Sequence, residues 1–155
     1  MLEVEIEDAS WASALPTAAA VAERAGQAVL DQIEPVESGD GPGVAVLLAS
    51  DDAVAELNER FRHKAGPTNV LSFPASANPE NHLGDVCLAY GVCAREAAEQ
   101  GKTLHDHLTH LVAHGVLHLL GYDHETDGEA EAMEALERSI LQSLGVPDPY
   151  ASERA

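Results

Sequence analysis

The segment HGVLHLLGYDH, residues 114–124, places three histidines close together, at spacings of four and then six residues. If the segment is helical, His114 and His118 lie one turn apart and can point both imidazoles at one ion. Gly121 would then end the helix and let the chain bring His124 back toward them. Three imidazole ligands with an open fourth position are typical of a zinc site that does chemistry. We therefore predict one Zn²⁺ per chain, bound by His114, His118 and His124.

Two further histidines, His107 and His110, precede this motif by one or two helical turns and continue the same stripe. Single histidines on a helix are more often surface residues or hydrogen-bonded core residues than metal ligands, so we expect no site role for either. Asp123 fits a turn residue and a hydrogen-bond partner of a ligand histidine equally well.

The spacing H-x-x-x-H-x-x-G-x-x-H also matches zinc proteases of the metzincin type. Those enzymes use a glutamate directly after the first histidine as the general base, whereas this chain has Gly115 at that position. Peptide hydrolysis by the usual route therefore lacks an obvious base. A zinc peptidase remains one alternative. A non-catalytic zinc-containing assembly module, in which Asp85 reaches the site, is another.

A small basic cluster stands out because the chain has only 8 lysines and arginines and a formal net charge of −19. That charge opposes non-specific binding to nucleic acid, so any such role must depend on local features. Arg60, Arg62 and Lys64 fall within five positions and form the favoured docking place for a phosphate. We predict that Arg62, Lys64 and Asn69 bind substrate, although Asn69 and Ser72 also fit a purely structural role in the turn.

Hydrophobic periodicity predicts the elements that hold these residues. The expected strands cover 2–8, 43–50, 69–74 and 83–90, and the expected helices cover about 16–33, 51–61, 91–100, 103–120 and 126–144. The strands precede most of the helices, which favours an α+β fold over a doubly wound parallel sheet. A length of 155 residues suits one domain spanning 1–155.

The chain carries no apolar run long enough to cross a membrane, and its acidic start, MLEVEIEDAS, is unlike a signal peptide. We therefore expect a cytoplasmic protein with no membrane partner. In that compartment the only two cysteines, Cys87 and Cys93, are expected to stay reduced.

The sequence resembles the YbeY family of single-domain, metal-dependent endoribonucleases. HGVLHLLGYDH (114–124) matches the histidine motif of that family, FRHKAGPTNVLSFP (61–74) its second hallmark, and LGDVCLAY (83–90) its third, and the ending LGVPDPY also fits. The resemblance implies a zincin-like α+β domain, with a small mixed sheet of about four strands packed with about five helices.

The resemblance also implies an activity and partners. The family's activity is that of a zinc-dependent, single-strand-specific endoribonuclease in ribosomal RNA processing, including 16S rRNA 3′-end maturation and ribosome quality control. The implied partners are ribosomal RNA, the small ribosomal subunit and assembly factors, and not DNA. The family's zinc ligands fall on His114, His118 and His124, and its functional arginine falls on Arg62. Arg62 and His114 are therefore the implied catalytic residues.

Overall fold

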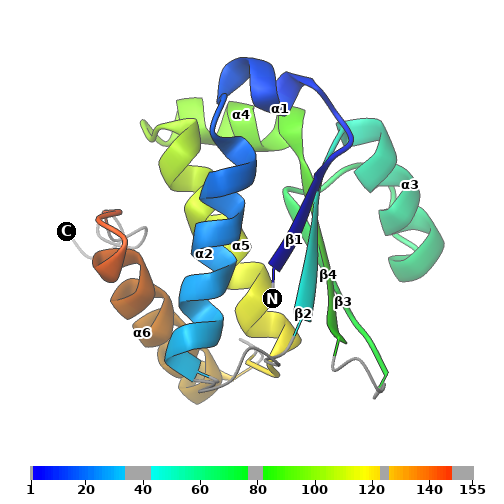
Figure 1. Cartoon of the computed structure of the whole chain (residues 1–155). Coiled ribbons are helices and arrows are strands. Elements are labelled where there is room, and N and C mark those ends of the chain that lie inside the picture. The colour runs from blue at the N-terminus through cyan, green and yellow to red at the C-terminus, as the bar shows by residue number, and fades with distance from the viewer. Residues whose placement is uncertain (1, 34–42, 77–81, 123–125, 148–155) are drawn as a thin grey trace.

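A computed structural model describes residues 2–33, 43–76, 82–122 and 126–147 of the chain. Its centre is a four-stranded sheet in the order β1-β2-β4-β3 (Figure 1). The strands are β1 (Leu2–Ile6), β2 (Gly43–Ala49), β3 (Val70–Pro74) and β4 (His82–Ala89). The first three strands in the spatial order are parallel, whereas β3 pairs antiparallel with β4 and forms one edge. This mixed sheet confirms the predicted α+β class.

Six helices accompany the sheet in the part of the chain that the structure describes. They are α1 (Ser10–Ala14), α2 (Ala18–Ile33), α3 (Asp51–Arg62), α4 (Tyr90–Glu99), α5 (Leu104–Leu119) and α6 (Asp127–Ser143). Five of them match predicted helices, and α1 is the addition. The short helix α1 is held by Trp11, whose buried indole N–H donates to the carbonyl of Ala49 at 3.0 Å and whose ring meets the Tyr90 ring edge-on.

The helices form two unequal layers around the sheet. Helices α2 and α5 lie side by side on one face, with α6 packed outside them, whereas α3 lies on the opposite side (Figure 1). The alternation of β2 follows from this arrangement, since Val44, Val46 and Leu48 are buried in the core that α5 shares. On the other face, α3 covers only part of the sheet.

Helix α5 is the central helix, and ten of its sixteen residues are buried. It begins where predicted, because the Thr103 hydroxyl accepts the backbone N–H of Asp106 at 3.1 Å and so caps the first turn. None of the described helices combines the length and the apolar character needed to span a bilayer. The histidines of α5 therefore lie on a helix that is largely buried in the fold.

Candidate active site

The end of α5 is a Schellman motif, which is the helix stop predicted at Gly121. The N–H of Gly121 donates to the carbonyl of His118 at 3.0 Å, and the N–H of Tyr122 donates to that of Leu117 at 3.1 Å. Gly121 has a φ of 98°, a left-handed conformation that glycine adopts without steric cost. The chain therefore turns sharply away directly after His118. His124 lies outside the described residues.

Four of the five histidines of α5 form a stripe, and they come closer together toward the end of the helix. The ring centroids of His107 and His110 are 6.2 Å apart, those of His110 and His114 are 6.1 Å apart, and those of His114 and His118 are 4.6 Å apart. In the last pair the two Nε2 atoms face each other at 3.0 Å. Two ligands of one tetrahedral zinc ion are separated by about 3.3 to 3.5 Å. The His114–His118 pair therefore has nearly the spacing that a shared ion requires.

A buried carboxylate from α6 contacts two of these histidines. The Oε1 atom of Glu137 lies 2.6 Å from Nδ1 of His114, and its Oε2 lies 3.1 Å from Nε2 of His110. The Glu137 side chain is 0% exposed, whereas those of His110 and His114 are 15% and 23% exposed. A carboxylate only accepts hydrogen bonds, so the ring nitrogens that face it act as N–H donors.

His110, His114 and Glu137 also form a group that could hold a metal ion, since each offers a ligand atom and these atoms lie within 4.8 Å of one another. The 2.6 Å contact between His114 and Glu137 is, however, a hydrogen-bond distance. It is shorter than the separation of about 3.3 to 3.5 Å between two ligands of one tetrahedral ion. The donor set suits a divalent metal ion, and the 3.0 Å between the Nε2 atoms of His114 and His118 is closer to that separation than the 2.6 Å contact is.

A pocket of about 530 Å³ opens beside the two paired histidines, between α5 and the edge strand β3. Its lining includes His114, His118, Tyr122 and, from the last turn of α3, Arg62. Arg62 thus brings a permanent positive charge to the pocket that holds the imidazoles. Lys64 is exposed in the loop after α3 and does not line this pocket.

Asn69 lines the same pocket, but its side chain is engaged in the protein. Its Nδ2 donates to Glu96 at 3.0 Å, and its Oδ1 accepts the N–H of Val70 at 2.7 Å. Glu96 also contacts Nε2 of His107 at 2.9 Å. These contacts favour the structural alternative for Asn69, as a residue that shapes the wall of the pocket.

Comparison with known proteins identifies the family. A family profile described as Endoribonuclease YbeY matches residues 5–145. The chain belongs to the YbeY family. It is 48% identical over 152 residues to an endoribonuclease YbeY from Maricaulis maris, covering 98% of this chain and 92% of the relative. It is 46% identical over 170 residues to that of Cereibacter sphaeroides, covering 97% of this chain and 98% of the relative.

The fold agrees with this family assignment. The solution structure of TM1509 from Thermotoga maritima matches with a TM-score of 0.58 and 25% sequence identity. The match covers 96% of this chain and 98% of the other. The sequence resemblance to the YbeY family is therefore confirmed over nearly the whole length of the chain.

Gly115 explains why this YbeY-family chain has no protease glutamate after His114. A Cβ at position 115 would lie 2.8 Å from Cγ1 of Val86 and 3.2 Å from Oγ of Ser72. The Ser72 hydroxyl also donates to the Gly115 carbonyl at 3.1 Å. Helix α5 therefore touches the sheet at this point, and a glutamate there would meet the packed core.

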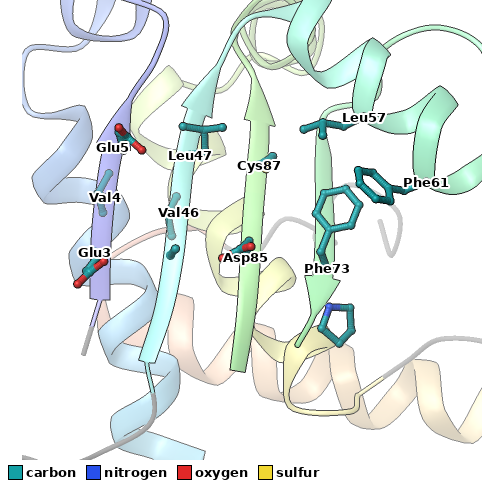
Figure 2. A pocket seen from close by; sticks show the side chains of 12 residues that line it. Glu3, Val4, Glu5, Val46, Leu47, Leu57, Phe61, Phe73, Asp85 and Cys87 are labelled. Atoms are coloured by element: carbon teal, nitrogen blue, oxygen red, sulfur yellow. The ribbon is translucent and has the colours of Figure 1, made fainter. Parts of the chain in front are cut away.

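Asp85 does not reach the histidine pocket, so the alternative in which it is an additional metal ligand is wrong. It contacts Nε2 of His82 at 2.9 Å and lines a different pocket, of about 970 Å³, on the open face of the sheet (Figure 2). Successive side chains of a strand point to opposite faces, and Asp85 falls on the face that α5 does not cover.

Glu137 is the site residue that sequence reasoning missed in this YbeY-family chain. The buried face of α6 includes Met133 and Ile140, four residues before and three residues after Glu137. An acidic residue inside that apolar stripe is a detectable signal, because charged residues are almost never fully buried without a partner. The sequence did not show which partner on another helix it would meet.

Proposed function

We propose that this chain is a zinc-dependent endoribonuclease that cleaves single-stranded RNA, acting in the cytoplasm on ribosomal RNA. The proposal is carried by one observation, that two imidazole Nε2 atoms only 3.0 Å apart lie on a pocket that Arg62, from another helix, also lines. Membership of the YbeY family, whose profile is described as Endoribonuclease YbeY, supports the reaction class.

His114 and His118 are the proposed zinc ligands, with His124 as the third. The near-ligand spacing of the two Nε2 atoms supports this choice over the buried group of His110, His114 and Glu137. Glu137 is 0% exposed, so an ion beside it would have little access to solvent or substrate. Bound zinc would supply a Lewis acid that polarises a phosphoryl oxygen.

Arg62 is the proposed phosphate-binding and catalytic residue. Its planar guanidinium can hold two phosphate oxygens and offset the charge that develops on them during cleavage. It lies at the end of α3 and lines the same pocket as the two histidines. Lys64, exposed two residues later, would add a longer-range positive charge for an approaching RNA strand.

The substrate and partners follow from the family resemblance. We propose 16S rRNA 3′-end maturation and ribosome quality control as the process, and the small ribosomal subunit and its assembly factors as partners. A net charge of −19 supports a specific over a general RNA-binding role, because the chain as a whole repels a polyanion. A single domain over residues 1–155 would then present one local site to the RNA.

Cleavage of a ribosomal precursor RNA by three matched samples tests this proposal. Zinc-loaded wild type should cleave its single-stranded segments, chelator-stripped wild type should not, and zinc added back should restore cleavage. His114→Ala, purified in parallel, should be inactive because the proposed site has lost a ligand. Equal cleavage by His114→Ala would point to a contaminating nuclease and contradict the proposal. Chelator-sensitive peptide cleavage with intact RNA would instead favour the peptidase alternative.

A further inference from the structure

Glu137 occupies an unusual position for a carboxylate. It lies in the middle of α6, is 0% exposed, and faces α5 between Met133 and Ile140, which are 1% and 0% exposed. Removing a carboxylate from water is costly unless hydrogen bonds replace its solvation. Two of its contacts in the fold are with histidines, at 2.6 and 3.1 Å. The site therefore includes a carboxylate held in place by imidazole N–H groups.

The contact with His114 determines which ring nitrogen of that residue carries the proton. An ionised Glu137 whose oxygen lies 2.6 Å from Nδ1 accepts an N–H from that atom, so a neutral His114 ring then keeps its lone pair on Nε2. That Nε2 atom is the one that faces Nε2 of His118 at 3.0 Å in the pocket. A metal ion needs such a lone pair, and a carboxylate behind the ring both orients it and raises its basicity.

We propose that Glu137 is a positioning residue that fixes His114 as its Nδ1–H tautomer and directs Nε2 into the pocket. The inference rests on the proposed function, in which Nε2 of His114 binds zinc. In this inference Glu137 orients a ligand histidine and does not itself bind the metal. His110, on the second carboxylate oxygen, then steadies Glu137 from the turn before His114.

The fold contains a second glutamate–histidine contact, and its histidine does not face the pocket. Glu96 contacts Nε2 of His107 at 2.9 Å, again from a helix packed against α5. His107 is 2% exposed and lines neither of the two pockets described here. Replacing each glutamate by leucine therefore removes a carboxylate beside an α5 histidine, and only His114 faces the pocket. Because Glu96 also accepts from Asn69 in the pocket wall, the two variants are compared by zinc affinity and not by RNA cleavage.

Two measurements on metal-free and zinc-titrated protein test the inference. The first is the imidazole ¹⁵N spectrum of metal-free protein at about pH 8, with His114 assigned by its absence in His114→Ala. Wild type should show His114 protonated at Nδ1, and Glu137→Leu should shift it toward Nε2–H. The second is the zinc dissociation constant from chelator competition. It should rise about 10- to 100-fold in Glu137→Leu and less than about 3-fold in Glu96→Leu.

The controls separate this inference from general loss of packing and from the proposed function. Ile140→Ala shortens a buried apolar side chain of α6 and keeps the Glu137 carboxylate, so it should leave the His114 spectrum unchanged. Wild-type His114 protonated at Nε2 would overturn the inference, and this test needs no mutant to fold. Unchanged zinc affinity in Glu137→Leu, while His118→Ala loses zinc, would overturn it as well. If His118→Ala binds zinc like wild type, the proposed metal site fails, whereas the tautomer result still judges the role of Glu137.

Discussion

Two pockets in the part of the chain that the structure describes differ in the groups they hold, and the smaller one holds the paired imidazoles. The pocket of about 970 Å³ on the open face of the sheet is lined by apolar side chains such as Leu47 and Phe73, with Glu3, Glu5 and Asp85 around them (Figure 2). The pocket of about 530 Å³ beside β3 instead brings together two imidazoles and a guanidinium. Volume therefore does not locate the site in this fold.

The difference arises from what each element presents to the two faces. The open face contains acidic residues and one thiol, Cys87, whose pKa burial raises to about 11 with a further contribution from Asp85. That thiol stays protonated near neutral pH and is a poor nucleophile or metal ligand. The other pocket receives imidazole nitrogens from α5 and an arginine from α3. Donor type and charge, and not size, distinguish the two.

Three consecutive residues of α3 offer the sharpest way to break this comparison. Arg62 lines the small pocket, Phe61 lines the large one, and Arg60 pairs with Glu56 on the surface. Arg62→Ala should lower RNA cleavage by about 100-fold or more, as removal of a charge-stabilising donor usually does, without loss of zinc. Phe61→Ala and Arg60→Ala should each cleave RNA at a rate within about 3-fold of wild type. A change of that size is far below the loss expected when one charge-stabilising donor is removed. Cleavage rates at saturating zinc measure this.

Two outcomes of that experiment would contradict the comparison of the two pockets. Undiminished cleavage by Arg62→Ala would remove the guanidinium from the mechanism. A loss in Phe61→Ala as large as that in Arg62→Ala would transfer the active site to the open face of the sheet.

A substitution at Gly115 tests how closely α5 must approach the sheet behind the small pocket. An alanine Cβ would lie 2.8 Å from Val86 Cγ1, so Gly115→Ala should lower the free energy of unfolding by about 1 to 2 kcal/mol. Gly128→Ala is the matched control in α6, because nothing lies within 4 Å of its added Cβ. Its unfolding free energy should stay the same or rise by up to about 1 kcal/mol. Urea unfolding of both variants measures this, and equal stability of the two would show that the contact at Gly115 is loose.

His107 should produce the smallest effect, a dependence of stability on pH that is unrelated to either pocket. Burial lowers its pKa below the usual 6.5, and its contact with Glu96 offsets this only in part. The folded protein therefore binds the His107 proton more weakly than the unfolded chain, so this residue reduces stability as the pH falls below 6.5. His107→Gln should show a shallower decline in unfolding free energy on acidification. An unchanged slope between wild type and variant would mean that other groups cause the decline.

The histidine pair could be predicted from sequence because its geometry is local. A spacing of four on a helix fixes the relation of His114 to His118, and a glycine three residues later fixes the helix end. The order of strands and helices likewise indicated the α+β class and all four strands. Arg62 was found because a cation cluster is conspicuous in a chain with a net charge of −19.

The parts that could not be predicted depend on how distant elements pack. Glu137 meets His114 across 23 residues, and that contact follows from the placement of α6 on α5. The burial of Trp11 could not be predicted either. Helix α1 spans only five residues, which is too short to show a hydrophobic periodicity. Asp85 was misjudged because its distance from the site depends on which face of β4 it occupies.

Zinc content of three purified proteins tests the central claim most directly, that the metal lies between His114 and His118 and not beside His110 and Glu137. Elemental analysis after zinc loading and desalting should give about one zinc per chain for wild type, well below one for His118→Ala, and about one for His110→Ala, as expected for a single tripodal site. Circular dichroism would establish that all three are folded. Zinc lost from His110→Ala but retained by His118→Ala would place the ion in the buried group and contradict the account.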